Sequence, residues 1–278
     1  MRRLNLISSI LTFVIRNPKA LLIALLLGGL SYSYEVFIAR DTMAFAGIPK
    51  AMDNSIPTYT RIFRNSAYMV GYSDIKGNPL WVVYKLTPPS ENASRLKRPE
   101  NFNADWRNFG FIDSNDYTNS GYDRGHMAPN HAISLLYGKQ AQIETFLMTN
   151  ITPQKPSLNQ KLWQRLEEIE LESFTSKFKE VWVYTGPLFD EKTTHLKSSR
   201  FVEIPDAFYK IYAGIEENGT IKVLAVIVPQ NAKTNDRIEK YIVSIDEVER
   251  RSGFDFLHQL QDSLEIILEK EINLAPWF

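Results

Sequence analysis

The sequence contains no cysteine among its 278 residues. Disulfide bonds, thiolate-bound zinc and a cysteine nucleophile are therefore excluded. Histidine is scarce as well, with four residues in the chain. A zinc site built from several histidines is disfavoured, so any metal is expected to be a hard cation held by oxygen ligands.

The chain also lacks a surplus of positive charge, since Lys and Arg together number 32, as do Asp and Glu. Four basic residues and no acidic residue precede Glu35, which leaves 28 basic and 32 acidic residues for the rest. Proteins that bind nucleic acid usually carry a basic surface, so the overall charge gives such a function no support. Hydrophobic residues make up 44% of the chain, which is ordinary for a globular protein with a sizeable core.

The longest uncharged hydrophobic run covers residues 20–34, and Glu35 is the only charged residue between residues 20 and 39. About 20 residues span a bilayer as a helix, and the run has no polar face, which disfavours a buried core helix. A cleaved signal peptide needs small residues soon after the run, whereas the best site, Ala44-Phe45-Ala46, lies well beyond it. The four preceding cations, Arg2, Arg3, Arg16 and Lys19, place later residues outside the cytoplasm. We expect an exported, membrane-anchored protein, or a periplasmic or secreted one if the segment is cleaved.

The pattern of the chain divides it into an N-terminal membrane anchor or signal segment (1–39), a linker (40–60) and one domain (61–278). Apolar runs between turn residues predict strands at residues 67–70, 80–86, 181–185, 201–204, 208–213 and 221–228. Gly186-Pro187 is expected to end the strand over residues 181–185. Helical spacing predicts helices over 158–174 and 244–251, and residues 87–120 form a polar loop. Strands and helices do not alternate, so we predict an α+β fold with an antiparallel sheet.

A cluster of chemically versatile residues occurs at Asp123-Arg124-Gly125-His126. Imidazole titrates near neutrality and can accept a proton from water, while an arginine can neutralise a phosphate oxygen. Glycine allows the backbone to approach a neighbouring group closely. The segment therefore suits phosphodiester hydrolysis, although it could also be a turn in which Asp123 and Arg124 form a surface pair.

Asn159 and Glu167 follow on the predicted helix, eight residues apart. This spacing is two turns plus about 80°, so both side chains can lean toward one site. An amide and an acid suit a hard cation that keeps most of its waters. Other interpretations remain: Asn159 could cap the helix, Glu167 could be a solvated charge, and Asn150 could be a turn residue.

The conjunction of these motifs resembles the DNA/RNA non-specific endonucleases of the ββα-metal class. The resemblance covers roughly residues 65–255 and rests on the order and spacing of several motifs. These are Asp123–His126, Asn150-Ile-Thr-Pro-Gln154, Leu158-Asn159-Gln160 with Trp163, Leu166-Glu167, Tyr184–Pro187, Ile204-Pro205, Phe208–Lys210 and Val228–Asn231.

The resemblance implies a fold and a set of roles. The fold is a central antiparallel sheet flanked by helices, preceded here by the N-terminal hydrophobic helix. His126 is similar to the general base, Asn159 to the direct Mg²⁺ ligand, and Glu167 to the acid that holds the metal through water. Arg124 is similar to a phosphate-contacting arginine, and Asn150 to an asparagine that supports the histidine region. Arg98, with Arg95 as its competitor, is the best match for a second arginine that stabilises the transition state.

The function that the resemblance implies is Mg²⁺-dependent hydrolysis of DNA and RNA, with Mn²⁺ as an alternative cation. Two other functions stay open on the same scaffold. One is a phosphodiesterase acting on a substrate other than nucleic acid, and the other is a membrane-anchored protein for nucleic-acid binding or uptake. The implied partners are DNA and RNA, the membrane through the N-terminal segment, and a second copy of the chain if a homodimer forms.

Overall fold

The structure is a computed structural model that describes residues 12–190 and 192–278. Arg2 and Arg3, two of the charges behind the predicted membrane orientation, lie outside these residues. The chain divides into two compact units, Met1–Thr42 and Met43–Phe278. All of the predicted site residues belong to the second unit.

The first unit contains one long helix, α2 (Pro18–Tyr34), which continues as the short π-helix η1 (Glu35–Ala39). Asn17 caps its start, because the side-chain oxygen accepts a hydrogen bond from the backbone N–H of Lys19 at 3.1 Å. None of its residues is buried by protein. The predicted apolar N-terminal helix is confirmed, and the stretch Pro18–Met43, with a mean hydropathy of 1.8, is long and apolar enough to cross a bilayer, as a signal sequence also is.

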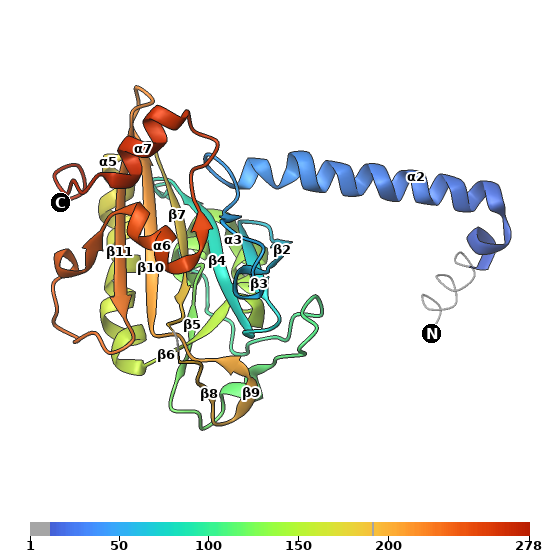
Figure 1. The fold of residues 1–278 in the computed structure, drawn as a ribbon, viewed down its shortest axis with the longest axis horizontal. Helices are drawn as coiled ribbons and strands as arrows, with labels where there is room; N and C mark the ends of the chain where they lie inside the picture. Colours follow the sequence, from blue (N-terminus) through green and yellow to red (C-terminus); the bar gives the residue numbers. More distant parts are fainter. Residues whose placement is uncertain (1–11, 191) are drawn as a thin grey trace. The chain divides into compact units, whose positions relative to one another are not determined.

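The second unit is built on an antiparallel sheet of seven strands in the order β12-β11-β10-β7-β4-β3-β2. In Figure 1 its long strands run side by side through the middle of this unit. The strands are β2 (Arg61–Arg64), β3 (Tyr68–Ser73), β4 (Asn78–Leu86), β7 (Glu180–Leu188), β10 (Ala207–Ile215), β11 (Ile221–Pro229) and β12 (Ile242–Val243). The predicted α+β class with antiparallel pairing is therefore confirmed.

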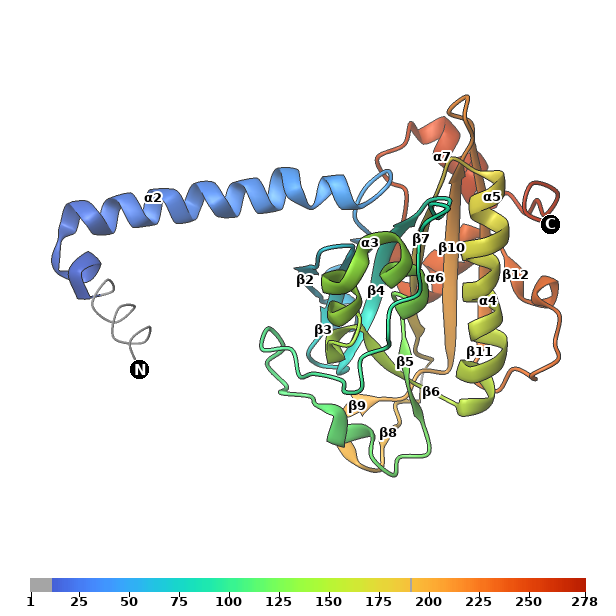
Figure 2. The ribbon, with the colours of Figure 1, turned by 180° about the vertical axis from the view of Figure 1, so that it is seen from behind.

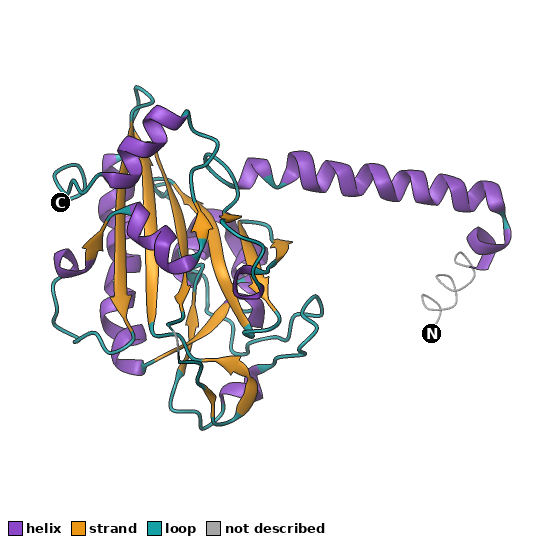
Figure 3. Cartoon of the chain, viewed as in Figure 1, coloured by secondary structure: helices purple, strands orange, loops and turns teal. Residues whose placement is uncertain are grey.

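The two faces of the sheet carry separate cores, since successive residues of a strand point to opposite faces. In β4, Tyr84 belongs to one core and Val83 to the other. A long helix over residues 158–177 and α3 (Asn130–Glu144) cover the first face, whereas α6 (Ile245–Ser252) and α7 (Asp262–Lys270) cover the second (Figures 1 and 2). Figure 3 shows the same layers coloured by type of secondary structure.

The long helix is not a regular α-helix along its whole length. It consists of two π-helical segments, η6 (Leu158–Trp163) and η7 (Glu170–Phe174), each followed by an α-helical one, α4 (Gln164–Ile169) and α5 (Thr175–Lys177). Its apolar side chains pack on the first face of the sheet. The predicted helix over 158–174 is confirmed, and it extends one short segment further.

The strand predicted over residues 181–185 is longer than expected, and Gly186-Pro187 does not end it. Gly186 pairs with Tyr209 and Pro187 with Phe208 on β10. A side chain at position 186 would place its Cβ 2.2 Å from the backbone oxygen of Leu80. Glycine is therefore needed here for close packing within the strand, and not for a turn.

Three short strand pairs lie outside the main sheet. They join β5 (Asp123–His126) to β6 (Ile151–Gln154), β8 (His195–Leu196) to β9 (Ser199–Glu203), and β1 (Lys50–Ala51) to β13 (Phe254–Asp255). Single 3₁₀ turns complete the fold at η2 (Asp41–Met43), η3 (Ile56–Thr58), η4 (Ser114–Tyr117), η5 (Met148–Asn150) and η8 (Ile238–Tyr241). Ala44 is buried in the core of the second face, so part of the segment predicted as a linker, residues 40–60, packs on the domain.

Candidate active site

The strand pair β5–β6 positions His126 at the end of β5. His126 pairs with Ile151, and Gly125 pairs with Thr152. A Cβ at position 125 would lie 2.2 Å from Oε1 of Gln154. The glycine of the motif leaves room for the side chain of Gln154, which crosses over it from β6.

Asn150 fixes the backbone that follows His126. Its Oδ1 accepts a hydrogen bond from the N–H of Ala128 at 2.8 Å, and its Nδ2 donates to the carbonyl oxygens of Ala128 at 3.0 Å and Thr145 at 2.9 Å. The side chain is fully buried. All polar groups of the amide are thus bound to backbone atoms, so Asn150 supports the histidine region from beneath and does not line the cavity described below.

His126 lies in an apolar environment that keeps its imidazole neutral. Its ring centroid is 5.4 Å from that of Phe102 and 4.9 Å from that of Phe146. Burial, followed by the nearby charge of Arg98, lowers the pKa of His126 to about 3. Its Nε2 is buried without a hydrogen-bond partner in the described part of the chain. A buried nitrogen left in this state is suited to accept a bond from a ligand or a water molecule.

Asp123 connects β5 to the helix that begins at Leu158. Its Oδ2 accepts hydrogen bonds from Nδ2 of Asn159 at 2.9 Å and from Nε2 of Gln160 at 2.8 Å. The side chain of Asn159 therefore does not cap the helix, whose N-cap residue is Ser157. With the amide nitrogen held by Asp123, the carbonyl oxygen is the atom that Asn159 can offer to a cation.

Glu167 shares a cavity with Asn159, although eight residues of regular α-helix would leave them about 80° apart. Asn159 lies in the π-helical η6, whose wider turns contain more residues per revolution and so reduce this offset. Burial raises the pKa of Glu167 to about 8 against the opposing charge of Lys210. A cation bound beside the carboxylate would lower this pKa again.

The cavity has a volume of about 500 Å³ and gathers nearly all of the predicted site residues. It is lined by Arg95, Arg98, Phe102, Tyr122, Asp123, Arg124, His126, Asn130, His131, Asn159, Gln160, Gln164 and Glu167. Three arginines face two carboxylates there, so the site is locally basic although the chain is neutral overall. His131 and Gln160 line the cavity as well, but the sequence predicts no role for them, because neither a histidine nor a glutamine in a first helical turn marks a site by itself.

The arginines occupy different positions around the cavity. Arg124 donates to the backbone oxygen of Ser114, and its guanidinium lies 5.7 Å from the centre of the Phe102 ring. Arg98 lies 5.0 Å from the centre of the Phe146 ring, which also contacts His126. Arg95 lines the same cavity, but Arg98 is the arginine whose charge acts on both His126 and Glu167.

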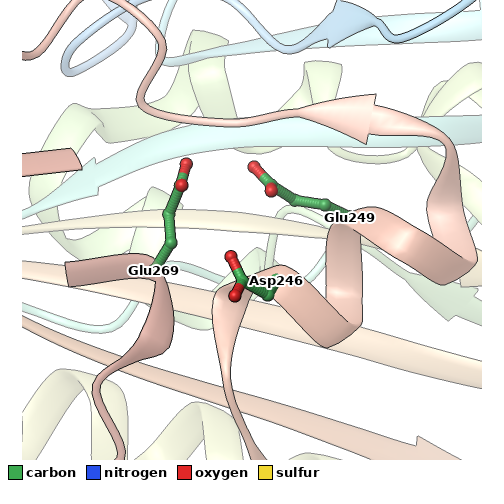
Figure 4. A group of neighbouring side chains, drawn as sticks. All are labelled: Asp246, Glu249 and Glu269. Atoms are coloured by element: carbon green, nitrogen blue, oxygen red, sulfur yellow. The ribbon is translucent and has the colours of Figure 1, made fainter. Parts of the chain in front are cut away.

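The residues present fit a hydrated hard cation. The amide oxygen of Asn159 and the carboxylate of Glu167 are the kind of ligand that Mg²⁺ takes, and few protein ligands suffice because Mg²⁺ keeps several waters. Among the residues that the structure describes, tighter groups of three acids occur elsewhere, at Asp246, Glu249 and Glu269 (Figure 4) and at Asp255, Glu265 and Glu269. Burial raises the pKa of Glu249 to about 8 and that of Glu269 to about 7. This acidic cluster lies with α6 and α7 on the second face of the sheet, away from His126.

Comparison with known proteins finds a matching family and similar nucleases. The family model described as DNA/RNA non-specific endonuclease matches residues 50–263. The chain is 30% identical to human "Endonuclease G, mitochondrial" over 215 residues, which cover 73% of this chain and 71% of the relative. It is also 30% identical to a protein named "Nuclease" from Nostoc over 220 residues, covering 74% of this chain and 76% of the relative.

A solved structure shows the same fold. The crystal structure titled as the EndoG/EndoGI complex superimposes with a TM-score of 0.61 and 24% identity, and it covers 74% of this chain and 89% of that one. The predicted ββα-metal arrangement is thereby confirmed. Its two strands are β5 and β6, and its helix is the one that runs from Leu158 to Lys177.

Proposed function

The chain belongs to the DNA/RNA non-specific endonuclease family, and from this premise we propose that it hydrolyses DNA and RNA with Mg²⁺, using His126 as general base. Two observations about His126 carry the proposal: its Nε2 has no hydrogen-bond partner among the described residues, and the residue lines one cavity together with Asn159 and Glu167. Such a cavity can hold a phosphate between the imidazole and the cation site.

His126 is held in the form that a general base requires. The imidazole is uncharged because its surroundings are apolar and Arg98 is near. The neutral ring accepts a proton at Nε2 from the water that attacks the phosphorus atom. Asn150 keeps the ring in place through the backbone of Ala128.

Asn159 and Glu167 provide the cation site. A bound Mg²⁺ supplies charge that polarises the scissile phosphate and stabilises the leaving oxygen. Asp123 orients the Asn159 amide by accepting from its nitrogen, which would leave the carbonyl oxygen to bind the cation. Glu167 holds the hydration shell from the next part of the helix. Mn²⁺, which also accepts oxygen ligands, is expected to substitute.

The arginines balance the negative charge that grows on the phosphate. Arg124 and Arg98 both line the cavity, and a guanidinium can bind two phosphate oxygens at once. Contacts to phosphate carry no direct information about base identity. We therefore expect cleavage of both DNA and RNA with little base preference.

The direct test is an assay of the purified chain on supercoiled plasmid, single-stranded RNA and phospholipid vesicles. We expect Mg²⁺ or Mn²⁺ to support internal cleavage of both nucleic acids, EDTA to stop it, and the lipid to stay intact. Cleavage that continues in EDTA would contradict the proposed metal dependence. Lipid hydrolysis alone would favour the phosphodiesterase alternative, and binding of DNA without cleavage would favour the uptake alternative.

We also propose that α2 (Pro18–Tyr34) is retained as a membrane anchor, with the second unit outside the cytoplasm. The helix is apolar on all sides and none of it is buried by protein. The full chain should then stay in the membrane pellet after a wash with alkaline carbonate, and protease added outside the cell should digest the domain. Recovery of the chain in the soluble fraction, shortened at its N-terminus, would show instead that the segment is a cleaved signal.

A further inference from the structure

A lysine is buried without any solvent exposure beneath the proposed cation site. Lys210 lies on β10 and is 0% exposed. Its Nζ forms an ion pair with the carboxylate of Glu170, which is equally buried, and lies 3.2 Å from the hydroxyl of Tyr84. Burying two charges costs free energy, and a buried pair is often no more stabilising than apolar residues of the same size. Stability alone therefore gives no reason for this pair.

The carboxylate of Glu170 is saturated by partners from the sheet. Its Oε1 accepts from Lys210 and from the hydroxyl of Tyr212 at 2.8 Å, and its Oε2 accepts from the hydroxyl of Tyr84 at 2.8 Å. Lys210 and Tyr212 lie on β10, whereas Tyr84 lies on β4, and β7 runs between these two strands. One side chain of the helix is thus held at three points on two strands. This buried tetrad, Tyr84, Glu170, Lys210 and Tyr212, fixes both the rotation of the helix and its position along the sheet.

The same helix carries the proposed cation ligands. Glu170 follows Glu167 by three residues, and Asn159 lies two segments earlier. Glu170 is also the first residue of the π-helical η7, and π-helical turns are rare and concentrate at functional sites. Lys210 reaches the first π segment as well, because its Nζ lies 4.8 Å from the centre of the Trp163 ring. A shift of the helix at the tetrad would therefore move Asn159 relative to Asp123 on β5, which orients its amide.

We propose that Lys210 is a positioning residue for the cation site. Its ion pair with Glu170, closed by Tyr84 and Tyr212, sets the rotation of the helix that presents Asn159 and Glu167, and thereby sets the affinity for a divalent cation. The inference rests on the proposed function, because that proposal assigns the cation to Asn159 and Glu167. It adds a residue that contacts neither cation nor substrate.

The test measures Mn²⁺ binding to the full-length chain by electron paramagnetic resonance, alongside the melting temperature. The first variant is the double change Lys210→Met with Glu170→Met, which leaves no unpaired charge. The second is Tyr212→Phe, a milder change that tests the effect on cation affinity if the double variant does not fold. Loss of supporting partners around a metal site typically weakens metal binding about 10–100-fold, so we expect the double variant to lie in that range and Tyr212→Phe to show a smaller loss in the same direction.

Tyr209→Phe is the matched control. Tyr209 lies on the same strand and is buried, but its hydroxyl donates to the carbonyl oxygen of Leu80 at 3.0 Å on the other face of the sheet. If the tetrad had only a structural role, the double variant, Tyr212→Phe and Tyr209→Phe would all have lower melting temperatures and an unchanged Mn²⁺ affinity. Wild-type affinity in a folded double variant would overturn the positioning role while leaving the nuclease proposal intact. A wild-type chain that binds no Mn²⁺ would remove both.

Discussion

Replacement of His126 by alanine is expected to lower the rate of nucleic-acid cleavage by about 10²–10⁴-fold, the usual contribution of general-base catalysis. The variant removes the nitrogen that accepts the proton from water. The backbone should stay in place, because Asn150 forms two hydrogen bonds with the backbone of Ala128 and one with that of Thr145, none of which involves the imidazole. Cleavage of plasmid DNA under single-turnover conditions measures the effect, and circular dichroism checks the fold.

His131→Ala is the control for this experiment. His131 lines the same cavity but begins α3 and belongs to no proposed step, so its loss should change the rate by less than about tenfold. If His131→Ala abolished cleavage and His126→Ala did not, the base would be misassigned. The comparison is informative because both variants remove an imidazole from one cavity.

Replacement of Asn159 by alanine is expected to weaken divalent-cation binding by about 100-fold or more, since even supporting partners of metal ligands are worth 10–100-fold. The amide oxygen of Asn159 is the proposed direct ligand, whereas Glu167 is proposed to hold the cation through water. Cleavage should fall at ordinary Mg²⁺ concentrations and recover partly at high ones. Isothermal titration with Mn²⁺ gives the affinity directly.

Gln160→Ala provides the matched control for Asn159. Both amides donate to the same oxygen of Asp123, at 2.9 Å and 2.8 Å, but only Asn159 is proposed as a ligand. Removal of Gln160 should therefore leave the cation affinity within a few-fold of wild type. Equal losses in the two variants would mean that the contact with Asp123 matters, and that the Asn159 oxygen is not a ligand.

Much of the sheet could be predicted from the sequence, because its central strands are apolar runs bounded by turn residues. The ends of a strand could not be predicted where a residue can either end the strand or lie within it. Gly186 and Pro187 usually end a strand, yet here they pair with β10 because the backbone of Leu80 leaves no room for a side chain. The sequence pattern does not predict the helix α3, because Gly138, with a φ of 81°, interrupts both the helical conformation and the helical spacing of the apolar residues.

The sequence motifs indicated most of the residues that the structure brings together around one cavity, and the roles of these residues stay predictions. His126, Arg124, Asn159, Glu167 and Arg98 all line one cavity. What the motifs could not give is how each residue is held. Asp123 orients Asn159 by linking β5 to the helix, and the buried tetrad joins Glu170 to residues that lie 40 or more positions away in the sequence on either side. Such contacts depend on tertiary packing that no local pattern records.

The two halves of the mechanism can be separated by measuring Mn²⁺ affinity and DNA cleavage in parallel on the His126→Ala and Asn159→Ala variants. We predict that the first binds Mn²⁺ as wild type does but does not cut, and that the second loses affinity and activity together. If the alanine at position 126 weakened Mn²⁺ binding as strongly as the alanine at position 159, or if either variant cut at the wild-type rate, an imidazole base facing an amide-held cation would not be the catalytic arrangement of this protein.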